Sequence, residues 1–102
     1  MDDKGLYAGL MRLHILHKAA EDEVCGVWVT EELRRHGYEL SPGTLYPMLH
    51  GLEKKGYLQS YKERDGKTMR RIYSITPRGK LILGDAKEKV RDLFGELFEA
   101  PR

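Results

Sequence analysis

The basic side chains of this sequence concentrate in one segment, residues 61–80. Seven of these twenty residues are Lys or Arg and two are Asp or Glu, which gives the segment a net charge of +5 in a chain of 102 residues whose net charge is +2. The rest of the chain is therefore mildly acidic. A basic segment on an otherwise acidic body is typical of a surface that binds the phosphate groups of a nucleic acid. A solvated surface ribbon is the alternative interpretation of the same charges.

A second group of candidate binding residues begins at Ser41 and Pro42. Ser41 is typical of a helix N-cap, where its hydroxyl would accept a hydrogen bond from an early backbone N–H, and Pro42 suits the first helical position. The free amides of that first turn would bind a phosphate oxygen. The first turn has no Arg, Asn or Gln, so strong bidentate recognition of a base is not predicted. The exposed face would carry short or planar side chains able to approach the floor of a DNA groove: Ser41, Gly43, Thr44, Tyr46, Pro47 and His50.

Apolar spacing and capping residues predict the two helices that come before this one. Residues 3–22 carry two neighbouring apolar stripes at helical spacing, and Gly26 ends or follows that helix. A short helix over residues 30–36 is expected to begin with Thr30 as N-cap and to end at Gly37. A surface helix normally has a single apolar stripe, so the two stripes of the first helix predict contacts with both its own domain and a partner.

The candidate binding helix buries one face. Leu45, Leu49 and Leu52 fall on that face at helical spacing, and Gly56 closes the segment. Pro47 lacks a backbone donor, so a local bend or a lost hydrogen bond is expected near the first turn.

A hairpin and a last helix complete the predicted fold. Residues 57–64 and 67–75 are β-like runs joined at Asp65-Gly66, a strong hairpin signal. Thr76-Pro77 is expected to start a final helix that continues to about Glu99. The order α-α-α-β-β-α is that of a mainly α fold with a β-hairpin wing, a winged helix-turn-helix, whose second helix of the pair enters the major groove of double-stranded DNA. The predicted DNA-binding residues are Ser41, Gly43, Thr44, Tyr46, His50, Arg64, Lys67, Arg70 and Arg71.

The final helix also predicts self-association. Its apolar residues repeat at heptad spacing over about two heptads, which favours a homodimer over the alternative of a core helix within one chain. We expect residues 1–76 to form the winged helix-turn-helix domain, including the first helix, and residues 77–102 to form a dimerisation helix. The residues predicted at the dimer contact are Leu6, Tyr7, Leu10, Met11, Leu83, Ala86, Val90, Leu93, Phe94 and Leu97.

Several classes of protein are disfavoured by the sequence. No apolar run is long enough to span a membrane, and the acidic N-terminus lacks the apolar run of a signal peptide. The single cysteine, Cys25, fits a reducing cytoplasm. No catalytic set, phosphate loop or paired cysteines are present, so neither an enzyme nor a cofactor is predicted. His14 and His17 lie three apart, but ordinary surface or interface histidines are expected there rather than a metal site.

Three stretches of the sequence carry a resemblance to a known family. They are residues 40–49 with the run Gly-Thr-Leu-Tyr-Pro, residues 52–58, and residues 71–79 with the pattern Arg-x-Tyr-x-x-Thr-x-x-Gly. With the flanking helices, the chain resembles the PadR family of bacterial transcriptional regulators over nearly its whole length. The resemblance implies a homodimeric repressor on palindromic operators, with the dimer made by the first and last helices.

The resemblance also implies a response to small molecules such as phenolic acids or drugs in some members. Some drug-binding members place a tryptophan on the last helix, whereas the only tryptophan here is Trp28, and the last helix offers Phe94 and Phe98. Because winged helices are also used without DNA, a protein-interaction module is the alternative function.

Overall fold

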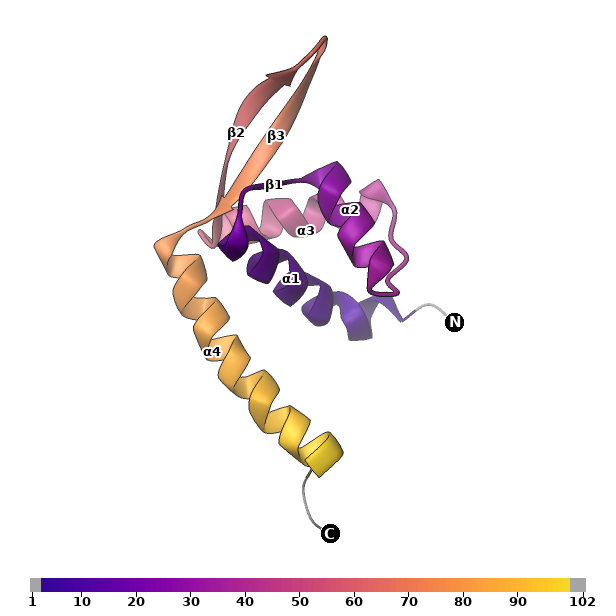
Figure 1. The fold of residues 1–102 in the computed structure, drawn as a ribbon, viewed down its shortest axis with the longest axis vertical. Coiled ribbons are helices and arrows are strands. Elements are labelled where there is room, and N and C mark those ends of the chain that lie inside the picture. Colours follow the sequence, from indigo (N-terminus) through magenta and orange to yellow (C-terminus); the bar gives the residue numbers. More distant parts are fainter. Residues whose placement is uncertain (1–2, 100–102) are drawn as a thin grey trace.

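The computed structural model describes residues 3–99. Residues 1–2 of the predicted winged helix-turn-helix domain and residues 100–102 of the predicted dimerisation helix lie outside the described residues. Four α-helices and a three-stranded sheet make up the fold (Figure 1). Their order along the chain is α1 (Lys4–Glu21), β1 (Val24–Cys25), α2 (Gly26–Arg35), α3 (Pro42–Lys54), β2 (Leu58–Asp65), β3 (Thr68–Ile75) and α4 (Pro77–Phe94), followed by a π-helical turn η1 (Gly95–Glu99). The predicted winged helix-turn-helix is confirmed.

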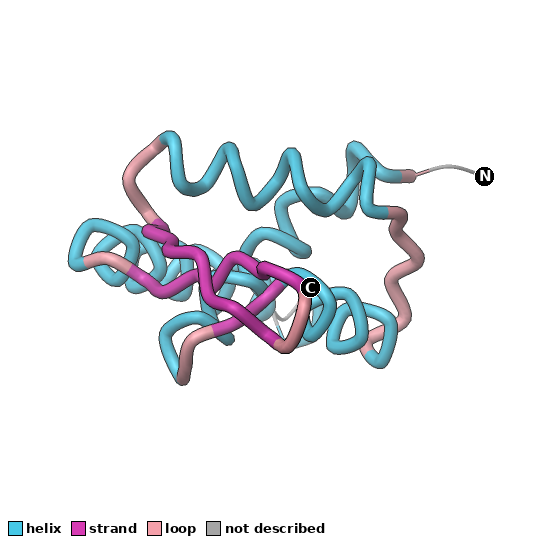
Figure 2. Tube along the Cα trace, turned by 90° about the horizontal axis from the view of Figure 1, so that it is seen from above, coloured by secondary structure: helices cyan, strands magenta, loops and turns pink. Residues whose placement is uncertain are grey.

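The core lies between the first three helices and the base of the sheet. Leu45 and Leu49 of α3 are completely buried, and Ile15 of α1 and Leu33 of α2 are nearly so. One stripe of α1, which contains Ile15, faces this core, whereas Leu6 at its N-terminal end stays exposed. Figure 2 shows the strands near the middle of the molecule with helices around them.

The sheet has the strand order β1-β3-β2, with both pairings antiparallel. The hairpin is confirmed, but its turn lies one residue later than predicted, because Asp65 pairs with Thr68 and the loop is Gly66-Lys67. Gly66 has a φ of +66°, which glycine adopts without the steric cost of a side chain. The short strand β1 was not predicted; it pairs Val24 with Tyr73 and Cys25 with Ile72.

The second helix begins four residues earlier than the sequence predicts. Cys25 occupies the N-cap position, and Gly26 is the first helical residue rather than the end of α1. Thr30 is therefore not a cap: it lies within α2, where its Oγ1 donates to the carbonyl oxygen of Gly26 at 2.9 Å. Gly26 is required for packing, because a Cβ there would lie 2.6 Å from the Tyr46 hydroxyl oxygen and 2.8–2.9 Å from two atoms of its ring.

The predicted bounds of α3 hold at both ends. Ser41 is at the N-cap, although within the described chain its hydroxyl makes no capping bond and instead lies 3.5 Å from the Thr44 hydroxyl. Gly56 follows the helix with a φ of +82°. The helix continues through Pro47, whose missing N–H leaves one carbonyl of the first turn without its helical donor.

The start of α4 is confirmed, and it is fastened to the base of the hairpin. Thr76 Oγ1 accepts from the Gly79 N–H at 3.0 Å and donates to the Gly56 carbonyl at 2.5 Å, while the Thr76 N–H donates to the Tyr57 carbonyl at 3.1 Å. From this junction the first part of α4 packs against α1, and its C-terminal part extends away from the other helices (Figure 1). Within residues 3–99, no helix is both long and apolar enough to cross a lipid bilayer.

Candidate nucleic-acid interface

Helix α3 presents its predicted binding residues on one outer face. The opposite face is buried through Leu45, Met48, Leu49 and Leu52, which fixes the rotation of the helix. Thr44 is half-buried and the other predicted residues are exposed, so the structure brings together Ser41, Gly43, Thr44, Tyr46 and His50. The Tyr46 ring rests on Gly26 of α2, and this contact positions the ring at the edge of the outer face.

The register of the hairpin sorts its charges onto two faces. Residues paired across antiparallel strands have side chains on the same face, and successive residues alternate between faces. The pairs Lys62–Arg71 and Arg64–Met69 therefore share one face, which we call the basic face of the wing. Within the described strands this face has no acidic residue. The pairs Glu63–Arg70 and Asp65–Thr68 lie on the other face, the mixed face.

The basic face lies on the side of α3. Ser60, on the same face, donates from its hydroxyl to Glu53 Oε2 of α3 at 2.7 Å, and Arg71 Nη1 donates to the same hydroxyl at 3.0 Å. Nearer the body this face continues into Leu58 and Tyr73, which are buried in the core. The base of the basic face is therefore joined to the C-terminal end of α3, and its three basic side chains lie on the side of the hairpin that meets this helix.

Arg70 is separated from the other predicted wing residues. It lies on the mixed face, where its Nε and Nη2 donate to Glu63 Oε2 at 3.2 and 3.0 Å and its Nη1 lies 3.9 Å from Asp65 Oδ2. The hydrogen bond that the guanidinium donates to Glu63 raises the pKa of Arg70 above its ordinary value. The alternation of side chains along a strand was the signal that could have separated Arg70 from Arg71 in the sequence.

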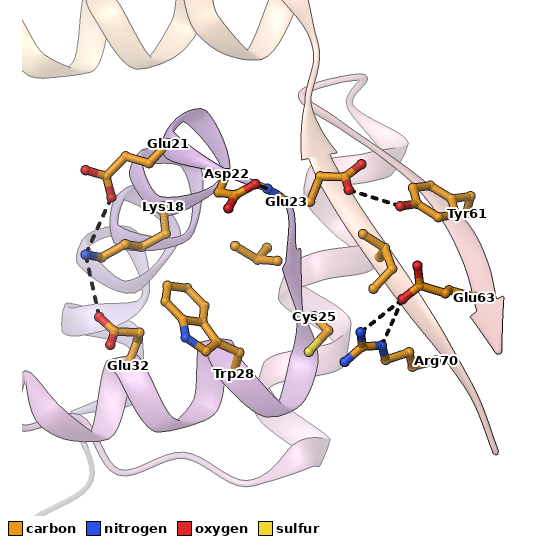
Figure 3. A pocket seen from close by; sticks show the side chains of 12 residues that line it. Lys18, Glu21, Asp22, Glu23, Cys25, Trp28, Glu32, Tyr61, Glu63 and Arg70 are labelled. Carbon is orange, nitrogen blue, oxygen red and sulfur yellow. Dashed lines mark hydrogen bonds and ion pairs between the residues drawn. The ribbon is translucent and has the colours of Figure 1, made fainter. Parts of the chain in front are cut away.

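The mixed face of the wing borders a cavity of about 590 Å³. Figure 3 shows that its walls come from the end of α1, from β1, from the start of α2 and from the wing. Several of its polar side chains interact with one another: Lys18 Nζ lies 3.6 Å from Glu21 and 3.5 Å from Glu32, and Tyr61 Oη donates to Glu23 Oε1 at 3.0 Å. The hydrogen bond to Glu23 raises the pKa of the Tyr61 phenol. Sequence reasoning did not identify Glu23 or Glu53 as partners of the wing.

The terminal helices carry a separate apolar surface. Leu6 and Leu10 of α1 and Val90, Leu93, Phe94 and Leu97 of the last helix and its π-helical turn are exposed, with Leu93 53% and Leu97 63% accessible. Two hollows of about 510 and 750 Å³ flank the line where α1 and α4 meet. Met11 and Leu83, also predicted at a dimer contact, are buried in the core of the chain itself.

The profile of the PadR-like family of transcriptional regulators matches residues 15–85, which include α2, α3, the whole wing and the start of α4. The chain belongs to the PadR-like family. The matched region contains the residues that carried the resemblance and the junction at Thr76. The chain is thus a transcriptional regulator with a winged helix-turn-helix of the type that binds DNA.

Individual relatives agree with membership of the PadR-like family. The chain is 48% identical over 87 residues to the transcriptional regulator Rv3488 of Mycobacterium tuberculosis, covering 85% of this chain and 81% of that protein. It is 39% identical over 59 residues to the transcriptional activator GvpE of Haloferax mediterranei, covering 57% of this chain and 31% of the activator. Among solved structures, a PadR family regulator from Eggerthella lenta is 27% identical with a TM-score of 0.78, covering 95% of this chain and 88% of that one.

His14 and His17, the two histidines at metal-ligand spacing, contact aromatic and acidic side chains in this PadR-like protein. The His14 ring stacks on that of His36 at a centroid distance of 4.6 Å, and Tyr38 packs edge-on against it at 5.5 Å. His17 Nε2 lies 3.7 Å from Glu21 Oε2. Within residues 3–99, no three His, Cys, Asp or Glu side chains are grouped to hold a metal ion.

Proposed function

We propose that two copies of this protein bind a palindromic operator in double-stranded DNA and repress transcription. In this proposal α3 enters the major groove and the basic face of the wing contacts the adjacent phosphates. The observation that carries it is the sorting of wing charges: Lys62, Arg64 and Arg71 lie on the side of α3, while the acidic residues lie on the other face. In a ribbon that is merely solvated, basic and acidic residues are expected on both faces, so this sorting favours a phosphate-binding surface.

The chemistry of α3 fits base contacts of modest strength. The hydroxyls of Ser41 and Thr44 donate to or accept from base edges or phosphates, and the Tyr46 ring suits a thymine methyl or a phosphate. His50 lies one turn further along the same face. Because none of these residues makes the bidentate contacts of Arg, Asn or Gln, a single half-site supplies limited specificity and two half-sites are needed.

The terminal helices supply the second copy in this proposal. The exposed apolar side chains of α1, α4 and η1 would leave water when a partner packs on them, at about 25 cal/mol for each Å² buried. The surface residues among the predicted contacts carry this role: Leu6, Tyr7, Leu10, Ala86, Val90, Leu93, Phe94 and Leu97. Residues 77–99 then act as the dimerisation helix, and a symmetric dimer places two α3 helices about one DNA turn, ~34 Å, apart.

DNA binding across a salt series tests the proposal. The wild type is expected to bind a duplex selected from a random library, with an affinity that falls by orders of magnitude as salt rises. Arg64→Ala should reduce the slope of log affinity against log salt by about 2, because each of the two subunits loses one phosphate contact. Arg70→Ala is the matched control, because this guanidinium is already paired with Glu63 on the mixed face, and its slope should change less. A protein that ignores DNA but captures a protein partner would instead support the interaction-module function.

Release by a small aromatic ligand completes the proposal. The hollow of about 510 Å³ between α1 and α4 is lined by Leu10, Val90 and Phe94 and by the basic Lys87 and Arg91. Such a lining suits an aromatic ring with an acidic group, and a ligand there would bear directly on the proposed dimer contact. A panel of aromatic acids should raise the thermal stability and lower the operator affinity; a panel that changes neither contradicts this part. Reporter transcription from the selected operator distinguishes repression from activation.

A further inference from the structure

Two adjacent residues of β2 tie the wing to the body from opposite faces. Ser60 donates to Glu53 of α3 at 2.7 Å, and Tyr61 donates to Glu23, in the turn before β1, at 3.0 Å (Figure 3). Because successive side chains of a strand point to opposite faces, one hydrogen bond holds the strand from the side of α3 and the other from the side of the cavity.

These hydrogen bonds lie where the core stops supporting the hairpin. Leu58, Ile72 and Tyr73 are buried, whereas beyond them nearly all the hairpin residues are exposed. In Figure 1 this outer part extends well away from the helices. An isolated two-stranded hairpin is only marginally stable in water and varies in twist, so its direction depends on what grips its base.

The Ser60 hydroxyl also holds a basic side chain of the wing. It accepts from Arg71 Nη1 at 3.0 Å while donating to Glu53, so Arg71 is connected to α3 through one hydroxyl. On the other face, the Arg70–Glu63 pair and the Tyr61–Glu23 bond lie along one wall of the cavity (Figure 3). These hydrogen bonds connect the wing to the segment before β1 and pair its charged side chains with each other, so they restrain the orientation of the wing relative to the body.

We propose that Ser60 and Tyr61 are positioning residues that fix the angle between the wing and α3, and thereby the preference of the protein for particular DNA sequences. The inference rests on the proposed DNA-binding function. Specific binding requires α3 at base edges and the wing at phosphates together, whereas non-specific binding requires only phosphate contacts. A wing that swings freely keeps its basic side chains and loses the fixed distance between the two contacts.

Affinity for two duplexes separates positioning from direct contact. The variants are Ser60→Ala, Tyr61→Phe and the double variant, assayed on a duplex selected by the wild type and on a scrambled duplex of the same composition. The double variant should bind the selected duplex roughly tenfold more weakly, the scale of two lost hydrogen bonds, with less than about a twofold change on the scrambled one. Its salt slope should equal that of the wild type. Lys62→Ala removes a direct contact from each subunit, so it should instead weaken binding to both duplexes and lower the slope by about 2.

Two further variants and one measurement without DNA complete the test. Ser60→Thr retains the hydroxyl and should restore wild-type affinity, and Gln59→Ala is the neighbouring control, having no side-chain hydrogen bond within the described residues. Residual dipolar couplings should show the wing amides of the double variant averaging over more orientations relative to α3. Unchanged couplings, or equal losses on both duplexes, overturn the inference. If the wild type binds no DNA but the couplings of the double variant change as expected, the proposed function is overturned, while the role of Ser60 and Tyr61 in fixing the wing stands.

Discussion

Gly79 gives the sharpest stability prediction, because α4 approaches the backbone at the base of the wing closely at this residue. A Cβ at this position would lie 2.1 Å from the Tyr57 carbonyl oxygen and 2.7 Å from Ile75 Cγ1. The Tyr57 oxygen belongs to the backbone and also accepts the Thr76 N–H at 3.1 Å. Gly79→Ala therefore forces the start of α4 away from the base of β2.

The expected cost of Gly79→Ala follows from three contributions. Overpacking against a fixed backbone costs about 1–3 kcal/mol. Loss of the Thr76–Tyr57 hydrogen bond adds about 1 kcal/mol. The better helix propensity of alanine returns about 1 kcal/mol. The variant should thus be less stable by about 1–3 kcal/mol, which lowers Tm by at least about 4 °C for a domain of this size.

Gly84→Ala is the matched control on the same helix. Apart from its chain neighbours and the backbone of its own helix, no described atom lies within 4 Å of a Cβ built at Gly84, so the substitution gains helix propensity without a clash. It should stabilise the protein by up to about 1 kcal/mol. Both variants are unfolded thermally and in urea at one protein concentration, because self-association links stability to concentration. If Gly79→Ala were as stable as the wild type, or if both variants shifted in the same direction, the packing argument would be wrong.

Three other predictions concern the DNA face, the dimer and pH. Gly26→Ala should weaken the free energy of DNA binding by more than it lowers the free energy of unfolding, because the added Cβ displaces the Tyr46 ring. A binding assay and unfolding followed by circular dichroism, on one sample, compare the two changes. Leu93→Glu should give a monomer in analytical ultracentrifugation, because it places a charge in the proposed apolar contact; a dimer would contradict that contact. Burial, together with the charge of His36, lowers the pKa of His14 below its ordinary 6.5, so the folded state binds fewer protons than the unfolded chain. Stability should therefore fall as pH drops below 6.5, and His14→Gln should flatten that dependence in urea unfolding at pH 5 to 7.

Local signals in the sequence were sufficient for the parts of the fold that depend on neighbours in the chain. The Leu45, Leu49 and Leu52 spacing gave the buried face of α3, and Thr76-Pro77 gave the start of α4. The start of α2 differs from the prediction because a glycine at this point of the sequence is typical of a helix end. The role of Gly26 is tertiary: it leaves room for the Tyr46 ring, which comes from another helix.

Long-range pairing accounts for the rest of what the sequence analysis missed. The two-residue strand β1 exists through its pairing with Ile72 and Tyr73, which lie far along the chain. The partners of Ser60 and Tyr61 are 7 and 38 residues away, so no local pattern indicates them. The separation of Arg70 from Arg71 is different, because strand alternation alone implies it once the hairpin is predicted.

The junction at Thr76 connects the two surfaces on which the proposed function depends. Thr76 donates hydrogen bonds to the carbonyls of Gly56 and Tyr57, which lead into β2. Thr76 itself is the residue between β3 and α4. Because Gly79 has no Cβ, the first turn of α4 packs closely against the same backbone. A rotation of α4 must therefore carry the base of the wing with it or break these contacts. In the proposed dimer, the packing of the α4 helices then sets the separation of the two wings as well as that of the two α3 helices, so a ligand that shifts α4 acts on both DNA contacts at once.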